Sequence, residues 1–301
     1  MSLHRLTSIT LGTPDVAASA AFYRDFGLTE NAPGVLATRD GGEQLRLVQA
    51  PRRRLVELGI GAEDAGDIER IAASLQQIGL AAERAAERLV VLEPASGVCV
   101  TVSVAAPIVQ PAAAPARANA PGQITRRNAR ADSFARTAPV VPRKLGHVVI
   151  GSPDATASRR FFVDGLGFKV SDEITGIASF LRCSKDHHNV LVQAAPVPFL
   201  HHTAWQVDDV DEIGRGAQAM IAADPRRHCW GLGRHFLGSN YFWYLREPSG
   251  AFAEYYSDLD VIDDDAAWHP AEAVGMNGLY AWGPPVPTEF IAPGDLLEGT
   301  A

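Results

Sequence analysis

The chain has 301 residues, enough for two domains that each have a hydrophobic core. With 47% hydrophobic and 21% charged residues, no apolar stretch of membrane-spanning length and no signal peptide, we expect a globular protein that does not enter a membrane. The net charge of -8 argues against a nucleic-acid partner, and three cysteines without metal-ligand spacing predict a cytoplasmic protein without disulfides.

Each half of the chain opens on a similar segment. Residues 9–15 (ITLGTPD) match residues 148–154 (VVIGSPD), and each segment leads into a helix-like stretch that contains an aromatic pair starting at Phe22 or Phe161. The offset is constant, because 148 minus 9 and 161 minus 22 both equal 139. The aspartate that ends each segment can cap the following helix.

A second repeated motif comes late in each half, as residues 93–97 (EPASG) and 247–250 (EPSG). Within each half, the order of one strand, one helix and several short strands occurs twice. Such units begin near Leu6, Leu55, Leu145 and His201. Because one such unit cannot bury its sheet face alone, we predict an α+β fold built from paired modules, two modules in each of two domains.

Composition also divides the chain. Residues 106–143 are rich in Ala, Pro and Arg and predict a linker between a first domain, residues 1–105, and a second domain, residues 144–258. The remaining residues, 259–301, are too aromatic and proline-rich for a free tail, so we expect them to pack on the second domain.

Three strand-like segments of the second half carry His147, His202 and Glu254. Two imidazoles and one carboxylate on rigid strands are typical of a facial triad, which binds Fe(II) on one side and leaves the other side open. The alternative for Glu254 is a structural ion pair with Arg234 or Arg246, because a carboxylate on an apolar strand face needs a partner.

The first half has other residues at the positions that match the three candidate ligands. Ser8 and Thr101 stand where the second half has His147 and Glu254, and residues 56–58 contain no histidine. The first half therefore has the signals of the fold without the ligands, and we predict that it binds no metal.

Two histidine doublets, His187-His188 and His201-His202, lie in the second half. Strand alternation places only one member of each doublet on the metal side, and alternation alone does not say which one. Tyr244 lies in the aromatic segment 241–244, for which packing in the core is the default interpretation.

Together these motifs resemble the type I extradiol ring-cleavage dioxygenases of the vicinal oxygen chelate (glyoxalase/bleomycin resistance/dioxygenase) superfamily. The resemblance is close over residues 144–258 and weaker over the first half. The spacing agrees with the family pattern, since 254 minus 244 is 10 and 254 minus 235 is 19. The matching motifs are LGH at 145–147, DHHN at 186–189, LHH at 200–202, GRH at 233–235 and the stretch 244–254.

The resemblance implies βαβββ modules of the vicinal oxygen chelate fold, with a barrel-like cup in each domain. It implies that the second cup holds Fe(II), or in some members Mn(II), on His147, His202 and Glu254. It also implies that His188 is an acid–base residue and that Tyr244 and His235 hydrogen-bond the substrate.

In the family pattern the second histidine of each doublet acts at the metal, so we interpret His187 and His201 as ordinary rim residues. One departure concerns the stretch after the GRH motif. Where some relatives have an acidic residue shortly after this motif, residues 236–240 of this chain read FLGSN.

The function implied is cleavage of a catechol ring beside its two hydroxyls, with O2 as the second substrate, by a homo-oligomer that acts in aromatic catabolism. A metal-free small-molecule-binding protein of the same fold is an alternative, but it needs no triad. A metal-dependent isomerase or thiol transferase is another. Related isomerases of the glyoxalase type use a further acidic ligand on the strand that ends the preceding module, and residues 189–193 (NVLVQ) contain none.

Overall fold

The computed structural model describes residues 3–115, 117–273 and 278–293. The first half contains two strand–helix–strands units. The first unit consists of β1 (Leu3–Thr13), α1 (Val16–Asp25), β2 (Thr29–Ala32), β3 (Val35–Thr38) and β4 (Gly42–Gln49). The second unit consists of β5 (Arg54–Ala62), α2 (Ala65–Gln77), β6 (Glu83–Ala85), β7 (Arg88–Leu92) and β8 (Cys99–Val104).

The second half repeats this order. Its first unit consists of β9 (Lys144–Ser152), α3 (Ala155–Arg160) with a π-helical turn η2 (Phe161–Gly165), β10 (Lys169–Ile174), β11 (Ala178–Arg182) and β12 (Val190–Ala194). Its second unit consists of β13 (Phe199–Gln206), α4 (Val210–Ala223) with a 3-10 turn η3 (Pro225–Arg227), β14 (His228–Arg234), β15 (Tyr241–Arg246) and β16 (Phe252–Ser257). The predicted α+β fold with four βαβββ modules is confirmed.

Helices α1 and α3 begin where the sequence predicts them to begin. The Asp15 carboxylate accepts a hydrogen bond of 2.9 Å from the backbone N–H of Ala18, and the Asp154 carboxylate accepts an equivalent bond of 2.9 Å from Ala157. Such a side chain satisfies one of the backbone donors that a helix leaves unpaired at its start. The two repeated segments therefore enter their helices in the same way.

Each half forms one sheet in which two modules meet. The strand orders are β2-β3-β4-β1-β5-β8-β7-β6 and β14-β15-β16-β13-β9-β12-β11-β10-β17. At the centre of the second sheet, β9 and β13 pair antiparallel, and each also pairs in parallel with the last strand of its own module, β12 or β16. These four strands bring both modules of the second half together.

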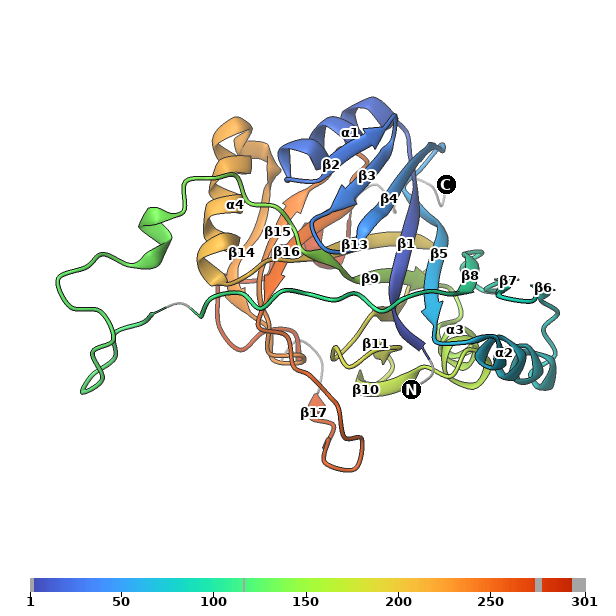
Figure 1. The fold of residues 1–301 in the computed structure, drawn as a ribbon. Coiled ribbons are helices and arrows are strands. Elements are labelled where there is room, and N and C mark those ends of the chain that lie inside the picture. Colours follow the sequence, from blue (N-terminus) through green and yellow to red (C-terminus); the bar gives the residue numbers. More distant parts are fainter. Residues whose placement is uncertain (1–2, 116, 274–277, 294–301) are drawn as a thin grey trace.

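The two halves share one hydrophobic core. Phe26, just after α1, stacks on Tyr255 of β16 with ring centroids 3.8 Å apart, and the Tyr255 hydroxyl donates a hydrogen bond to the Phe26 carbonyl. At the other end of the molecule α2 and the α3–η2 segment lie together (Figure 1), where Gly165 lies against Leu75. Helices of one half thus cover elements of the other half.

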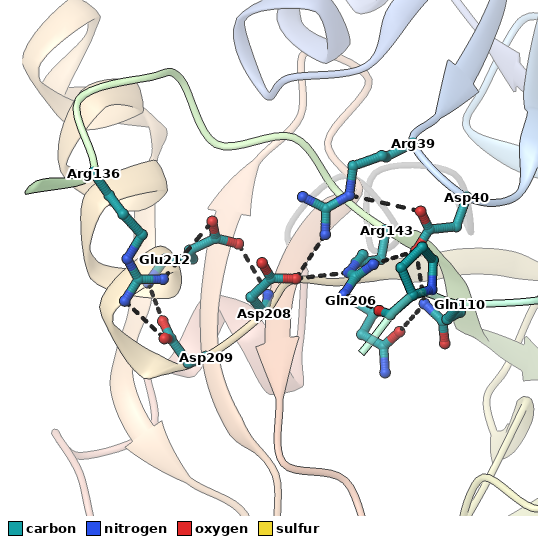
Figure 2. Close-up of polar contacts among 10 residues, drawn as sticks. Arg39, Asp40, Gln110, Arg136, Arg143, Gln206, Asp208, Asp209 and Glu212 are labelled. Carbon is teal, nitrogen blue, oxygen red and sulfur yellow. Dashed lines mark hydrogen bonds and ion pairs between the residues drawn. The ribbon is translucent and has the colours of Figure 1, made fainter. Parts of the chain in front are cut away.

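The described residues of the segment 106–143 contact both halves and include a short helix, η1 (Asp132–Ala135). Arg143 lies between Asp40 of the first half and Asp208 of the second and donates to both carboxylates, at 2.9 and 2.6 Å (Figure 2). Gln110 similarly donates to Asp40 and to Gln206. This network fixes both ends of the segment against the two halves.

The described part of the chain after residue 258 packs on the second sheet. Strand β17 (Glu272–Ala273) pairs in parallel with β10, and helix α5 (Thr288–Ile291) places Phe290 in a cluster with Trp230 and Tyr244. In the described residues, no helix has the length and apolar character needed to cross a membrane. All three cysteines are free, as their spacing predicts.

Candidate active site

The structure brings His147, His202 and Glu254 together on the central strands β9, β13 and β16 of the second sheet. The His147 Nε2 atom lies 3.2 Å and the His202 Nε2 atom 3.5 Å from Glu254 Oε2, and the two nitrogens lie 3.4 Å apart. All three side chains are buried. The three atoms therefore face one common point.

These atoms fit a bound metal ion. Glu254 is fully buried, its Oε1 atom accepts a hydrogen bond from Asn240, and its Oε2 atom has no hydrogen-bond donor among the described residues. Burying an unpartnered carboxylate oxygen is costly, so Oε2 needs a cation. Ligand atoms about 2 Å from one ion and at right angles to each other lie about 3 Å apart, which is close to the separations seen here.

The alternative that Glu254 forms a structural ion pair with an arginine is wrong. Arg234 pairs with Asp258 at 2.8 Å, and Arg246 pairs with Glu289 at 2.5 Å. Both arginines have other carboxylate partners, so neither neutralises Glu254.

The strand register relates the two histidines to each other. On the antiparallel pair β9 and β13, His147 lies opposite Ala204 and His202 lies opposite Val149. A local twofold axis between these strands exchanges His147 with His202 and Ala204 with Val149. The two histidines therefore occupy equivalent positions in their modules.

The same symmetry identifies the position at which a fourth ligand would stand. Glu254 on β16 lies opposite Ala204, and the residue that lies opposite Val149 on β12 is Leu191. Leu191 has no ligand atom. The described residues of the site therefore include three candidate metal ligands, and the position next to them on β12 is apolar.

His188 lies beside the triad, in the loop between β11 and β12, with its ring centroid 4.1 Å from that of His147. Burial and, to a lesser extent, the nearby histidines hold the pKa of His188 well below its ordinary value. The ring is therefore neutral near neutral pH and has one nitrogen free to accept a proton.

Tyr244 on β15 lies opposite Glu254, and its hydroxyl lies 2.8 Å from His235 Nε2. The other ring nitrogen of His235 lies 2.6 Å from the carbonyl of Leu279, which can only accept, so this nitrogen carries the proton. In neutral His235, Nε2 then accepts from the tyrosine. Burial and the Glu254 charge raise the pKa of Tyr244 well above its ordinary value, so the hydroxyl keeps its proton.

Comparison with known proteins agrees with this geometry. Residues 144–255 match the model of the Glyoxalase/Bleomycin resistance protein/Dioxygenase superfamily. The chain is 32% identical over 299 residues to metapyrocatechase 2 of Cupriavidus necator. This alignment covers 96% of this chain and 92% of that protein. The chain belongs to the extradiol ring-cleavage dioxygenases of this superfamily.

Solved structures show the same fold. Homoprotocatechuate 2,3-dioxygenase of Brevibacterium fuscum superposes with a TM-score of 0.75 at 19% identity, over 96% of this chain and 92% of that one. A Mn(II)-bound glyoxalase from Novosphingobium aromaticivorans superposes with a TM-score of 0.72 at 26% identity, over 94% of this chain and 91% of that one. Proteins named as a dioxygenase and as a glyoxalase thus share this fold. The fold alone therefore does not decide the reaction, and the residues of the site must do so.

The interpretation of His187 and His201 as rim residues is wrong, because both are buried in this dioxygenase. The Nδ1 atom of His201 lies 2.8 Å from Nδ1 of His202, and its Nε2 atom lies 2.7 Å from the Phe290 carbonyl. Simple alternation fails at both doublets. His187 lies in a loop, and the pairing of β13 with β9 shifts register between Leu200 and His202.

Asn240 is a site residue that the sequence indicated only as part of a departure from the family pattern. It is fully buried at the end of the stretch 236–240, and its amide donates to Glu254 Oε1 at 3.0 Å. A neutral donor here orients the carboxylate without adding charge, which leaves Oε2 directed at the two histidines.

A cavity of about 240 Å³ opens next to the triad of the dioxygenase. Four aromatic residues of the second half are candidates for a pocket that binds an aromatic ring. Phe180 is part of the cavity wall, whereas Trp205 is in the core, Phe236 is exposed and Trp243 does not line the cavity. The C-terminal segment also contributes to the wall, which composition could not specify. The apolar wall residues of this cavity are Val149, Ile174, Ile177, Ala178, Phe180, Leu191, Ala194, Leu237, Leu279, Phe290 and Ile291.

The first half of the dioxygenase has a different set of residues at the corresponding positions. Glu57 on β5 lies opposite Thr10, where the second half has His202 opposite Val149. The Thr101 hydroxyl donates to the Glu57 carboxylate at 2.9 Å. In the described ranges the His147, His202 and Glu254 group is the one cluster of His, Cys and acidic side chains with the geometry of a metal site.

Proposed function

We propose that this dioxygenase binds one Fe(II) through His147, His202 and Glu254 and uses O2 to open a catechol ring beside its two hydroxyls. The observation that carries the proposal is a site with three protein ligands in which Leu191 stands at the fourth position. Two oxygens of a catechol and O2 need the coordination positions that such a site leaves free. The 32% identity with metapyrocatechase 2 supports the same class of reaction.

When bound, Fe(II) stabilises the deprotonated catechol oxygens and allows electrons of the ring to reach O2. The chain supplies the proton handling. We propose that His188 takes a proton from a catechol hydroxyl and returns it later. We also propose that the Tyr244 hydroxyl, which donates to His235 in this structure, turns to donate its hydrogen bond to the oxygen that gains charge. Mn(II) fits the same donor set of two imidazoles and a carboxylate.

A metal-dependent isomerase is the second candidate, because of the fold match to the Mn(II)-bound glyoxalase. Leu191 counts against it, since the further acidic ligand expected for an isomerase of that type would stand there. A binding protein without metal is a weaker candidate, because Glu254 Oε2 would then be buried without a partner.

We also propose that residues 1–105 form a structural domain without metal, that residues 106–143 link it to the metal-binding domain of residues 144–258, and that residues 259–301 form a tail that packs on that domain. The Glu57–Thr101 hydrogen bond in the first cup supports the first of these proposals. The homo-oligomeric state and the cytoplasmic location stay predictions.

The cavity indicates which catechols this enzyme accepts. Among the described residues no Lys, Arg, Asp or Glu lines the cavity, and the polar wall residue outside the histidines and Tyr244 is Gln193. In the sequence, residues 274–277 and 294–301 contain no Lys or Arg either. We propose that the substrate is a catechol whose ring substituent is uncharged and apolar, because a charged substituent would find no partner in this wall.

Oxygen uptake with a matched pair of substrates tests both proposals. We expect the Fe(II)-loaded protein to consume one O2 per 3-methylcatechol. We expect 2,3-dihydroxybenzoate, of similar size, to give a kcat/KM about 100-fold or more lower, since its carboxylate would lose water without a countercharge. No O2 uptake with any catechol would contradict the proposed activity. Faster turnover of 2,3-dihydroxybenzoate would contradict the substrate class alone.

A further inference from the structure

A buried carboxylate–histidine pair lies directly behind His188. His187 has no exposed surface, and its Nε2 atom lies 2.7 Å from Oδ2 of Asp172 on β10. Its other nitrogen, Nδ1, lies 3.0 Å from Nδ1 of His188. Asp172 is 2% exposed, and its second oxygen accepts a hydrogen bond of 2.6 Å from the backbone N–H of Ala271. Asp172, His187 and His188 thus form one chain of contacts that ends at the cavity.

The C-terminal segment closes this chain of contacts off from water. The Asp260 carbonyl accepts from the backbone N–H of His187, and the Trp268 ring lies 5.4 Å from the His187 ring. Trp268 is itself held by a hydrogen bond from its ring N–H to the Ser171 carbonyl. A carboxylate and two imidazoles that are buried in this way need a consistent set of protons.

Only one arrangement of protons satisfies every contact when both rings are neutral. The Asp172 carboxylate can only accept, so His187 Nε2 carries a proton and His187 Nδ1 does not. Two nitrogens that face each other share one proton, so the proton lies on His188 Nδ1. The remaining nitrogen of His188, Nε2, then has a lone pair, and His188 lines the cavity where catechol would bind.

We propose that Asp172 and His187 are positioning residues that hold His188 in the tautomer whose free Nε2 lone pair faces the substrate. This proposal rests on the acid–base role of His188 in the proposed function. A base at this position needs a lone pair aimed at the catechol hydroxyl, and the tautomer of a histidine is set by the hydrogen bond that its other nitrogen makes. Asp172 acts through His187, and neither of them contacts the substrate.

Asp172→Asn reverses this tautomer with little change in shape. The N–H of Ala271 requires an acceptor, so the oxygen of the new amide faces Ala271 and its NH2 group faces His187. His187 Nε2 must then accept, which moves the ring proton to Nδ1 and makes His188 Nδ1 the acceptor. The proton of His188 would consequently lie on Nε2, toward the substrate. Glu173→Gln is the matched control, because Glu173 is the next residue on β10 and is exposed.

For Asp172→Asn in the Fe(II)-loaded protein we expect kcat to fall by about 10- to 100-fold, by analogy with the hydrogen-bond partners of metal-bound histidines. The iron content and the anaerobic Kd for 3-methylcatechol should stay within about twofold of wild type, because ligands and cavity are unchanged. Glu173→Gln should match wild type. His187→Phe should lose a similar factor in kcat, and the double variant should be no slower than His187→Phe alone, since Asp172 acts through His187.

The tautomer itself can be read without turnover, by 15N NMR of protein with labelled histidine loaded with diamagnetic Zn(II). We expect wild-type His188 to be protonated at Nδ1 and bare at Nε2, and Asp172→Asn to exchange the two. A wild-type His188 protonated at Nε2 would overturn the proposal, as would an Asp172→Asn variant with wild-type kcat. Failure of the proposed function has a different signature, since no catechol would then consume O2 while the NMR result would still stand.

Discussion

Glu254→Gln will bind little iron. Wild-type protein reconstituted with Fe(II) under anaerobic conditions should contain about one iron per chain, as a single three-ligand site requires. The amide of glutamine is a poor ligand, and its NH2 group would face two imidazole nitrogens that lie within 3.5 Å of Glu254 Oε2. The loss in affinity should exceed the roughly 10- to 100-fold that partners of metal ligands contribute.

Elemental analysis of the reconstituted variants measures this effect. The matched control is Glu57→Gln, the same change in the first half. Glu57 occupies the position in the first half that is equivalent to His202 in the second. We expect that control to keep about one iron per chain. Circular dichroism would verify that both variants fold. A Glu254→Gln protein with a full complement of iron would contradict the assignment of this carboxylate, and a loss in Glu57→Gln would indicate a second site.

His188→Phe should have the opposite pattern, with iron and substrate binding kept and turnover lost. Phenylalanine fills the space of the buried ring next to Phe180 and His147 but cannot accept a proton. Because a lost general acid–base group typically costs ~10² to 10⁴ in rate, kcat should fall in that range while the iron content stays near that of wild type. The fall in kcat should exceed that of Asp172→Asn, which keeps the His188 ring and only moves its proton from one nitrogen to the other.

Steady-state O2 uptake together with elemental analysis separates the two roles. His228→Phe is a suitable control, because His228 lies on β14 against Trp243 and does not line the cavity. It should behave as wild type. Loss of iron in His188→Phe would contradict this assignment. His188 would then be a metal ligand, and one of the three proposed ligands would be the acid–base residue.

The modules could be predicted because their signals are local. A capping aspartate at residue 15 or 154 and a turn motif such as residues 247–250 each act over a few residues, and their repetition at a fixed offset identifies duplicated units. His147, His202 and Glu254 could be found for a related reason. Each lies on a central strand, and β13, which carries His202, pairs with both β9 and β16, which carry the other two residues.

The surroundings of the triad depend on contacts that no local pattern contains. His201 is buried because Phe290, 89 residues later, supplies its acceptor, and His235 depends in the same way on the Leu279 carbonyl. The Asp172–His187 pair joins a strand to a loop 15 residues away. The equivalence of the Leu191 and Glu254 positions follows only from the strand register, because the two residue types have no chemical feature in common.

The position of ring cleavage tests the central claim most directly. Anaerobic addition of 3-methylcatechol to the Fe(II)-loaded protein should change the iron spectrum without turnover, since O2 is the second substrate. Admission of O2 should then give a ring-opened semialdehyde with strong near-ultraviolet or visible absorption, because cleavage beside the two hydroxyls leaves a conjugated product. A colourless dicarboxylic acid, the product of cleavage between the hydroxyls, would contradict the account, as would an Fe(III)–tyrosinate absorption band that assigned Tyr244 as a ligand.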